Sequence, residues 1–178
     1  MLRKNILTFI AIAAISLVIM YIIFLSGLIS DVIPAEMGPT SYEHEGAIIT
    51  SRIEAPKEVY RVGERVDIVP RLINAGNNNI TISHSDPAFI IDVYNAAGVK
   101  VWVYQYPQLS IGSVVELKPG VPYSWDEDKM KERYDIRLSL PGQYKIVSHT
   151  EFLIEEPGKA NLEQGLVYSE PIIITVVP

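Results

Sequence analysis

The sequence predicts an all-β fold, an antiparallel β-sandwich, preceded by one transmembrane helix. From Gly46 onward, short runs rich in β-branched and aromatic residues alternate with turn signals, which is typical of a sandwich. No stretch of this part shows the 3.6-residue apolar period of an amphipathic helix. Residues Ile6 to Ile29, by contrast, form one uninterrupted apolar run without a charge.

The apolar run has the length and composition of a membrane-spanning helix. As a helix it would reach about 36 Å, which exceeds a hydrocarbon core of about 30 Å. A cleaved signal peptide would have a shorter apolar core and a small-x-small cleavage site, and the run offers neither. As the core helix of a soluble protein, a run of this length would need a polar side that faces the solvent, and this run has none. We therefore expect residues 1–30 to be a retained anchor, with residues 6–29 in the membrane.

Charges on either side of the run predict its orientation. Arg3 and Lys4 precede it, whereas Asp31 and Glu36 follow it. Positive flanks stay in the cytoplasm. We therefore expect a single-pass protein of the cell membrane with a cytoplasmic N-terminus and an extracytoplasmic domain.

The exported part is acidic and has no cysteine. Two of the 15 basic residues and none of the 21 acidic residues precede Asp31, so 13 basic and 21 acidic residues give the remainder a formal charge of −8. This balance argues against binding to nucleic acid. The lack of cysteine excludes disulfides, thiolate metal sites and cysteine nucleophiles.

Residues 31–45 contain Pro34, Gly38 and Pro39 among mixed charges, and are predicted to form a linker. The globular domain is then expected to span residues 46–178. Its predicted strands lie at 47–55, 65–74, 79–83, 89–95, 99–105, 113–118, 121–125, 142–154 and 171–177. Residues 158–165 are expected to form a polar loop before the last strand.

Two local patterns refine this prediction. Val66, Ile68 and Leu72 should share one face of their strand, and Pro70 should interrupt its hydrogen-bond ladder. Residues 95–98, Asn-Ala-Ala-Gly, predict a hairpin in which Gly98 supplies the positive φ of the turn.

The order FIIDVYNAAGVKVWVYQ, LKPGVPYSWDED and LPGQYKIVSH resembles the intracellular proteinase-inhibitor family typified by the Bacillus inhibitor BsuPI. The matching pieces are Phe89 to Tyr94, Gly98 to Trp102, Leu117 to Asp126, and Pro141 to Tyr144, and the resemblance covers roughly residues 58–150. It implies an Ig-like β-sandwich. The family's namesake acts inside the cell, whereas this chain carries an apolar run that predicts export, and no inhibitory residue can be matched.

No catalytic or cofactor-binding constellation is evident in the sequence. His44, His84 and His149 are the only histidines, and none pairs with another at a metal-ligand spacing. His84 and Asp86 are the only weak candidates for a metal site, and His149 is expected at the surface. Nucleotide-binding and hydrolase motifs are absent. We therefore expect no cofactor and no enzymatic activity.

Asn79-Ile80-Thr81 is a sequon for N-glycosylation on the expected outer side of the membrane. Asn79 is thus a candidate modification site.

Aromatic residues are the remaining candidates for function. Five of them fall near two predicted strands: Trp102, Tyr104, Tyr106, Tyr123 and Trp125. They would either pack the sandwich or form an exposed patch that anchors a protein partner.

Three classes of function remain open. The first is a non-catalytic binding or assembly module, an accessory subunit of a membrane or envelope complex with a protein partner at the outer surface. The second is a BsuPI-like protease inhibitor, with residues 105–113 as the only loop long enough to block a protease. The third is a metal-binding or catalytic subunit.

Overall fold

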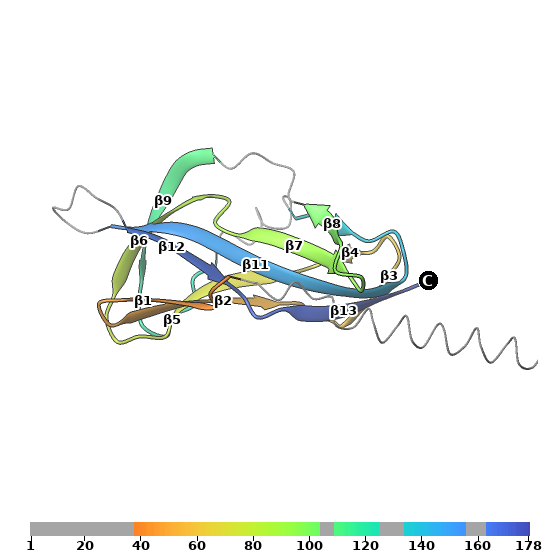
Figure 1. Ribbon diagram of the computed structural model, residues 1–178, viewed down its shortest axis with the longest axis horizontal. Helices are drawn as coiled ribbons and strands as arrows, with labels where there is room; N and C mark the ends of the chain where they lie inside the picture. The colour runs from red at the N-terminus through yellow and green to blue at the C-terminus, as the bar shows by residue number, and fades with distance from the viewer. Residues whose placement is uncertain (1–37, 104–108, 125–133, 156–162) are drawn as a thin grey trace, which may run out of the picture.

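A computed structural model describes residues 38–103, 109–124, 134–155 and 163–178 (Figure 1). These residues form strands joined by turns. The strands are β1 Ser41–His44, β2 Ala47–Glu54, β3 Val59–Arg61, β4 Arg65–Val66, β5 Val69–Asn74, β6 Ile80–Asp86, β7 Ile90–Asn95, β8 Lys100–Val103, β9 Leu109–Leu117, β10 Ile136–Arg137, β11 Gly142–Ile154, β12 Glu163–Tyr168 and β13 Ile172–Val177.

The strands form two main sheets that face each other, as Figure 1 shows. The larger sheet has the order β3-β13-β11-β6-β9, with β12 and β7 also paired to β11 and with β8 paired to β7. The smaller sheet has the order β1-β2-β5, and β4 and β10 form a short separate ribbon. All of these pairings are antiparallel except the parallel pairing of β13 with β3. The predicted all-β, sandwich-like fold is therefore confirmed.

Strand β11 is the centre of the larger sheet. It pairs with β13 and then β12 along one edge, and with β7 and then β6 along the other. Its sequence alternates along this length, so Tyr144, Ile146, Phe152 and Ile154 are buried in the core. Because side chains alternate across a strand, the residues between them point to the opposite side of the sheet.

The core lies between the two sheets. Ile49 and Leu72 of the smaller sheet are fully buried with Ile82, Ile146 and other residues of the larger one. Such burial stabilises the fold by about 1.5–3 kcal/mol for each large apolar side chain. The core thus covers one face of the larger sheet and leaves the other face to the solvent.

A buried asparagine fixes the turn that joins the two sheets. Asn74 is fully buried, and its Nδ2 donates to the carbonyl oxygens of Asn78 at 2.7 Å and Leu117 at 3.0 Å. Its Oδ1 accepts from the backbone N–H of Gly76 at 3.0 Å. A Cβ on Gly76 would lie 2.3 Å from the carbonyl oxygen of Gly46, so only glycine fits this crossing.

Of the two local patterns, the first is confirmed in part. Val66, Ile68 and Leu72 are buried as predicted. The expected interruption at Pro70 is wrong, because Pro70 lies within β5 and pairs with Ile53 of β2, and the strand breaks earlier, between β4 and β5. β7 and β8 form the predicted hairpin, with Gly98 at a φ of 73°.

Three expectations about element positions are wrong. The predicted linker ends in a strand, β1, whose residues 41–44 pair with β2. The predicted polar loop ends in β12, which begins at Glu163 and pairs with β11. The predicted strand at 121–125 is described only over residues 121–124, which meet β5 in one bridge, between Leu72 and Tyr123.

The predicted anchor at residues 6–29 lies outside the described residues. Among the residues that are described, no helix has the length and apolar character needed to cross a membrane.

Candidate functional site

The solvent side of the larger sheet carries the candidate site, and we call it the outer face. It is formed by the side chains of β11 that point away from the core, Lys145, His149, Glu151 and Leu153, and by their cross-strand neighbours. Val147 lies in the same row and is nevertheless buried, although it is not part of the core cluster between the sheets. Part of the outer face is therefore also covered, by side chains that do not belong to the core between the two sheets.

A buried carboxylate lies at one end of the outer face. Asp92 of β7 is 6% exposed, and Lys100 of β8 places its Nζ 2.9 Å from Oδ1. Burial lowers the pKa of Lys100, but the hydrogen bond and charge of Asp92 outweigh this effect and raise the pKa overall. Burial and the same carboxylate raise the pKa of Tyr94. Lys100 therefore supplies the counter-charge for the buried carboxylate.

His149 continues the outer face next to this pair. Its Nδ1 lies 3.8 Å from Oδ2 of Asp92, and its ring stacks on Tyr168 of β12 with centroids 4.8 Å apart. Burial lowers the pKa of His149, while the charges of Asp92 and Glu151 oppose the shift. His149 lies on the solvent side of the sheet as expected, but Tyr168 covers its ring and leaves the side chain 14% exposed.

A groove of about 420 Å³ follows His149 along β11. Glu151, Leu153 and Glu155 line one side of it, and Val114 of β9 lines the other. The remaining lining comes from Ser83, His84, Ser85, Gly112, Phe152 and Gln164. The groove thus combines two carboxylates with apolar side chains.

The weak metal candidate His84 has a structural role instead. The residue is 3% exposed, and its Nδ1 donates to the carbonyl oxygen of Ser85 at 2.8 Å. Since Nδ1 carries the proton in the neutral ring, Nε2 accepts from the Tyr123 hydroxyl at 2.7 Å. Both nitrogens are engaged, so His84 could ligate a metal only by breaking one of these bonds. Asp86 comes two residues later, at a register shift between β6 and β9.

Two of the five aromatic candidates lie in described residues with described side chains. Trp102 is partly buried and packs against the core, opposite Val93 of β7. Tyr123 also packs against the core, and burial raises the pKa of its hydroxyl, to which Asp86 adds. Tyr104, Tyr106 and Trp125 lie outside the described residues. Contact between these aromatic residues and a partner stays a prediction.

Asn79 lies at the exposed end of the turn before β6. Its Nδ2 donates to Oε1 of Glu116 at 3.1 Å. The side chain is accessible, and its glycosylation stays a prediction.

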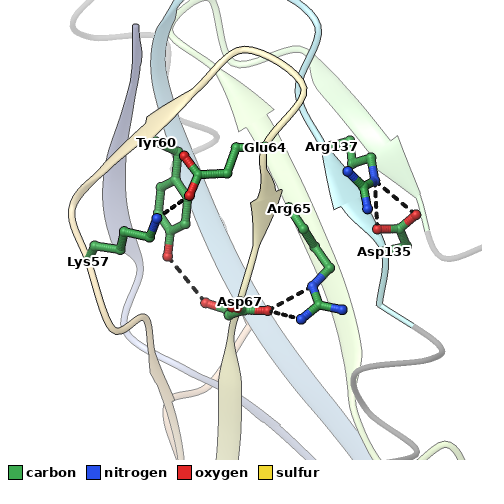
Figure 2. Close-up of polar contacts among 7 residues, drawn as sticks. All are labelled: Lys57, Tyr60, Glu64, Arg65, Asp67, Asp135 and Arg137. Carbon is green, nitrogen blue, oxygen red and sulfur yellow. Dashed lines mark hydrogen bonds and ion pairs between the residues drawn. The ribbon is translucent and has the colours of Figure 1, made fainter.

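Ion pairs gather at the end of the molecule near β3, β4 and β10. Figure 2 shows Arg65 directed at Asp67 and Arg137 directed at Asp135, with contacts of 2.8 and 2.9 Å. Lys57 pairs with Glu64 in the same region. Each of these three cations therefore has its own carboxylate.

Sequence reasoning missed the outer face, although a signal was present. The predicted strand at 142–154 carries, at every second position, Lys145, Val147, His149, Glu151 and Leu153. An alternation that places three ionisable groups on one face marks that face as solvent-side. The sequence does not show which β7 and β8 residues lie beside them.

Comparison with known proteins assigns no family. No family model and no curated protein match the chain. Among solved structures, a β-glucosidase from Erythrobacter marinus shares 14% identity over 74% of this chain and 16% of its own, with a TM-score of 0.32. Spo0M, a sporulation control protein from Bacillus subtilis, shares 14% identity over 72% of this chain and 49% of its own, with a TM-score of 0.34. At this level of similarity, neither protein's activity carries over.

Proposed function

We propose that this chain is a membrane-anchored, extracytoplasmic binding module that holds a protein partner and performs no chemistry of its own. In this proposal the β-domain is an Ig-like sandwich, residues 6–29 form the transmembrane anchor, and the outer face contacts the partner. The resemblance to the BsuPI family supports the Ig-like class by analogy only.

The observation that carries the proposal is the difference between the two faces of the larger sheet. One face is covered by β1, β2 and β5, whereas the outer face presents a groove with Val114 65% exposed and Leu153 37% exposed. Apolar side chains beside polar ones in a concave surface are typical of recognition sites. The ion pair between Lys100 and the buried Asp92, together with the His149–Tyr168 stack, holds the neighbouring surface in one arrangement.

The length of chain between anchor and domain limits where the partner lies. Ile29 and Gly38 are separated by nine peptide steps. A fully extended chain of this length spans at most about 32 Å. The domain would therefore remain close to the bilayer, and its partner would be a membrane protein or a protein held at the membrane surface.

Photo-crosslinking in intact membranes tests this proposal. A photoreactive amino acid at Leu153 should give a discrete adduct with another protein, because the side chain borders the groove. The same amino acid at Val121, which is 55% exposed beside β5, is the matched control and should give none. Absence of any adduct from Leu153 and Val114 would contradict the proposal.

The inhibitor function implied by the family resemblance makes a different prediction. Of its candidate loop at residues 105–113, residues 105–108 lie outside the described residues, and residues 109–113 are not a loop but belong to strand β9. Inhibition of a purified protease at a one-to-one ratio would favour that function over the binding module.

A further inference from the structure

We infer that the groove on the outer face binds an extended, basic segment of the partner, with Lys or Arg side chains two positions before and after an apolar residue. This inference rests on the proposed binding function and specifies the chemistry of the partner.

The row along β11 gives the spacing. Glu151, Leu153 and Glu155 all line the groove, and they occupy alternate positions of the chain. The backbone N–H of Glu155 donates to the carbonyl oxygen of Thr81 at 2.9 Å, so the row continues in extended form beyond the end of the strand. Alternate residues of an extended chain lie about 6.6 Å apart. The groove therefore presents an acidic, an apolar and an acidic group in register with a second extended chain.

The opposite wall favours an apolar residue at the centre. Val114 projects into solvent across from this row, and it pairs with Ser83 of β6. Gly112 has no side chain here, and a Cβ at this position would lie 3.2 Å from the carbonyl oxygen of His84. Ser83 pairs with both Val114 and Leu153, and its side chain is small, so space remains for a partner side chain between Val114 and Leu153.

The charges in the groove lining indicate which charge the partner segment carries. The lining includes two glutamates and no Lys or Arg, and neither glutamate forms an ion pair within the described part of the chain. Figure 2 shows the contrasting arrangement near β3, where Lys57, Arg65 and Arg137 each face a carboxylate. The formal charge of −8 on the exported part adds a long-range attraction for basic segments.

The spacing of the two glutamates favours two separate cationic groups over a single bound ion. Glu151 and Glu155 are four positions apart in an extended chain, which corresponds to about 13 Å between their Cα atoms. A metal ion needs oxygen atoms at about 2.0–2.6 Å, so a single shared ion would require both glutamate side chains to bend toward each other over Leu153. Two cationic side chains on one partner segment match the separation.

Binding of a labelled nine-residue peptide to the full chain in detergent micelles tests the inference. The peptide has Lys at its third and seventh positions, Val at the fifth and Thr elsewhere, and anisotropy reports binding. We expect binding that weakens with salt and falls about tenfold in the double variant E151Q/E155Q. Retained binding in E58Q/E170Q is the matched control, since these exposed glutamates do not line the groove. A charge-reversed peptide with Glu at both positions should not bind.

Equal binding of the basic peptide to the unmodified chain and to E151Q/E155Q would overturn the inference, as would equal binding of the two peptides. Failure here is distinct from failure of the proposed function. If Leu153 still crosslinks to a protein partner and E151Q/E155Q leaves that adduct unchanged, the binding module stands and the basic segment is wrong. If no adduct forms at all, the binding module itself is wrong.

Discussion

At the scale of single residues, the His84–Tyr123 pair is the clearest structural test. Tyr123→Phe removes the hydroxyl that donates to Nε2 and leaves a buried ring nitrogen without its hydrogen bond. We expect the change to lower the free energy of unfolding by about 1–3 kcal/mol. Tyr94→Phe is the control, because its hydroxyl makes only a 3.4 Å contact with Asp92. Thermal melts of both variants should show the larger loss for Tyr123→Phe; equal losses would contradict the role assigned to His84.

His149 should make stability depend on pH. Burial lowers its folded-state pKa below the usual value of 6.5, with Asp92, Glu151 and Lys100 as the charged groups that act on it. As pH falls through about 6.5, the unfolded chain takes up the proton first, so the folded state loses stability down to the folded-state pKa. His149→Gln should therefore flatten the fall in melting temperature between about pH 7.5 and pH 5.5. An unchanged dependence of melting temperature on pH would show that His149 does not cause the loss of stability at low pH.

At the scale of elements, the turn between β5 and β6 depends on Asn74. Asn74→Ala would leave the carbonyl oxygens of Asn78 and Leu117 and the N–H of Gly76 without their side-chain partner. We expect a loss of about 3 kcal/mol or more in denaturant unfolding. Asn95→Ala provides the comparison, because Asn95 also bonds two backbone N–H groups but in an exposed turn, where water replaces it. A similar loss of unfolding free energy in both variants would mean that burial of Asn74 does not explain the size of its effect.

The elements that could be predicted from sequence are those whose pattern is local. β11 follows from its alternation, and the β7–β8 hairpin follows from the Gly98 turn. β1 and β12 depend on contacts distant in sequence. The Tyr42 ring meets Phe152 at 5.4 Å, and the N–H of Tyr168 donates to the carbonyl oxygen of Pro39 at 2.8 Å. Neither contact leaves a periodic signal in residues 31–45 or 158–165.

The candidate site was harder to predict for the same reason. Sequence reasoning selected His84 because His and Asp lie close in the chain, but the structure directs both nitrogens of His84 to protein groups. The outer face instead joins Asp92, Lys100 and His149 from three strands. Only the register of β7, β8 and β11 brings these residues together, and a single sequence does not specify that register.

At the scale of the whole molecule, the flanking charges predict topology. Residues 31–178 should be removed by protease added to right-side-out spheroplasts, since Arg3 and Lys4 keep the N-terminus in the cytoplasm. A cytoplasmic marker protein must stay intact in the same sample. Full protection of the domain would contradict the expected orientation.

The central claim is that the full chain works in a complex with a protein partner. Its most direct test is the native mass of the chain extracted from its own membranes in mild detergent at native abundance. We expect a discrete species heavier than the 19.9 kDa chain, containing a second, different protein in fixed ratio. Recovery of the chain alone at 19.9 kDa, with the domain shown to be folded, would contradict the claim.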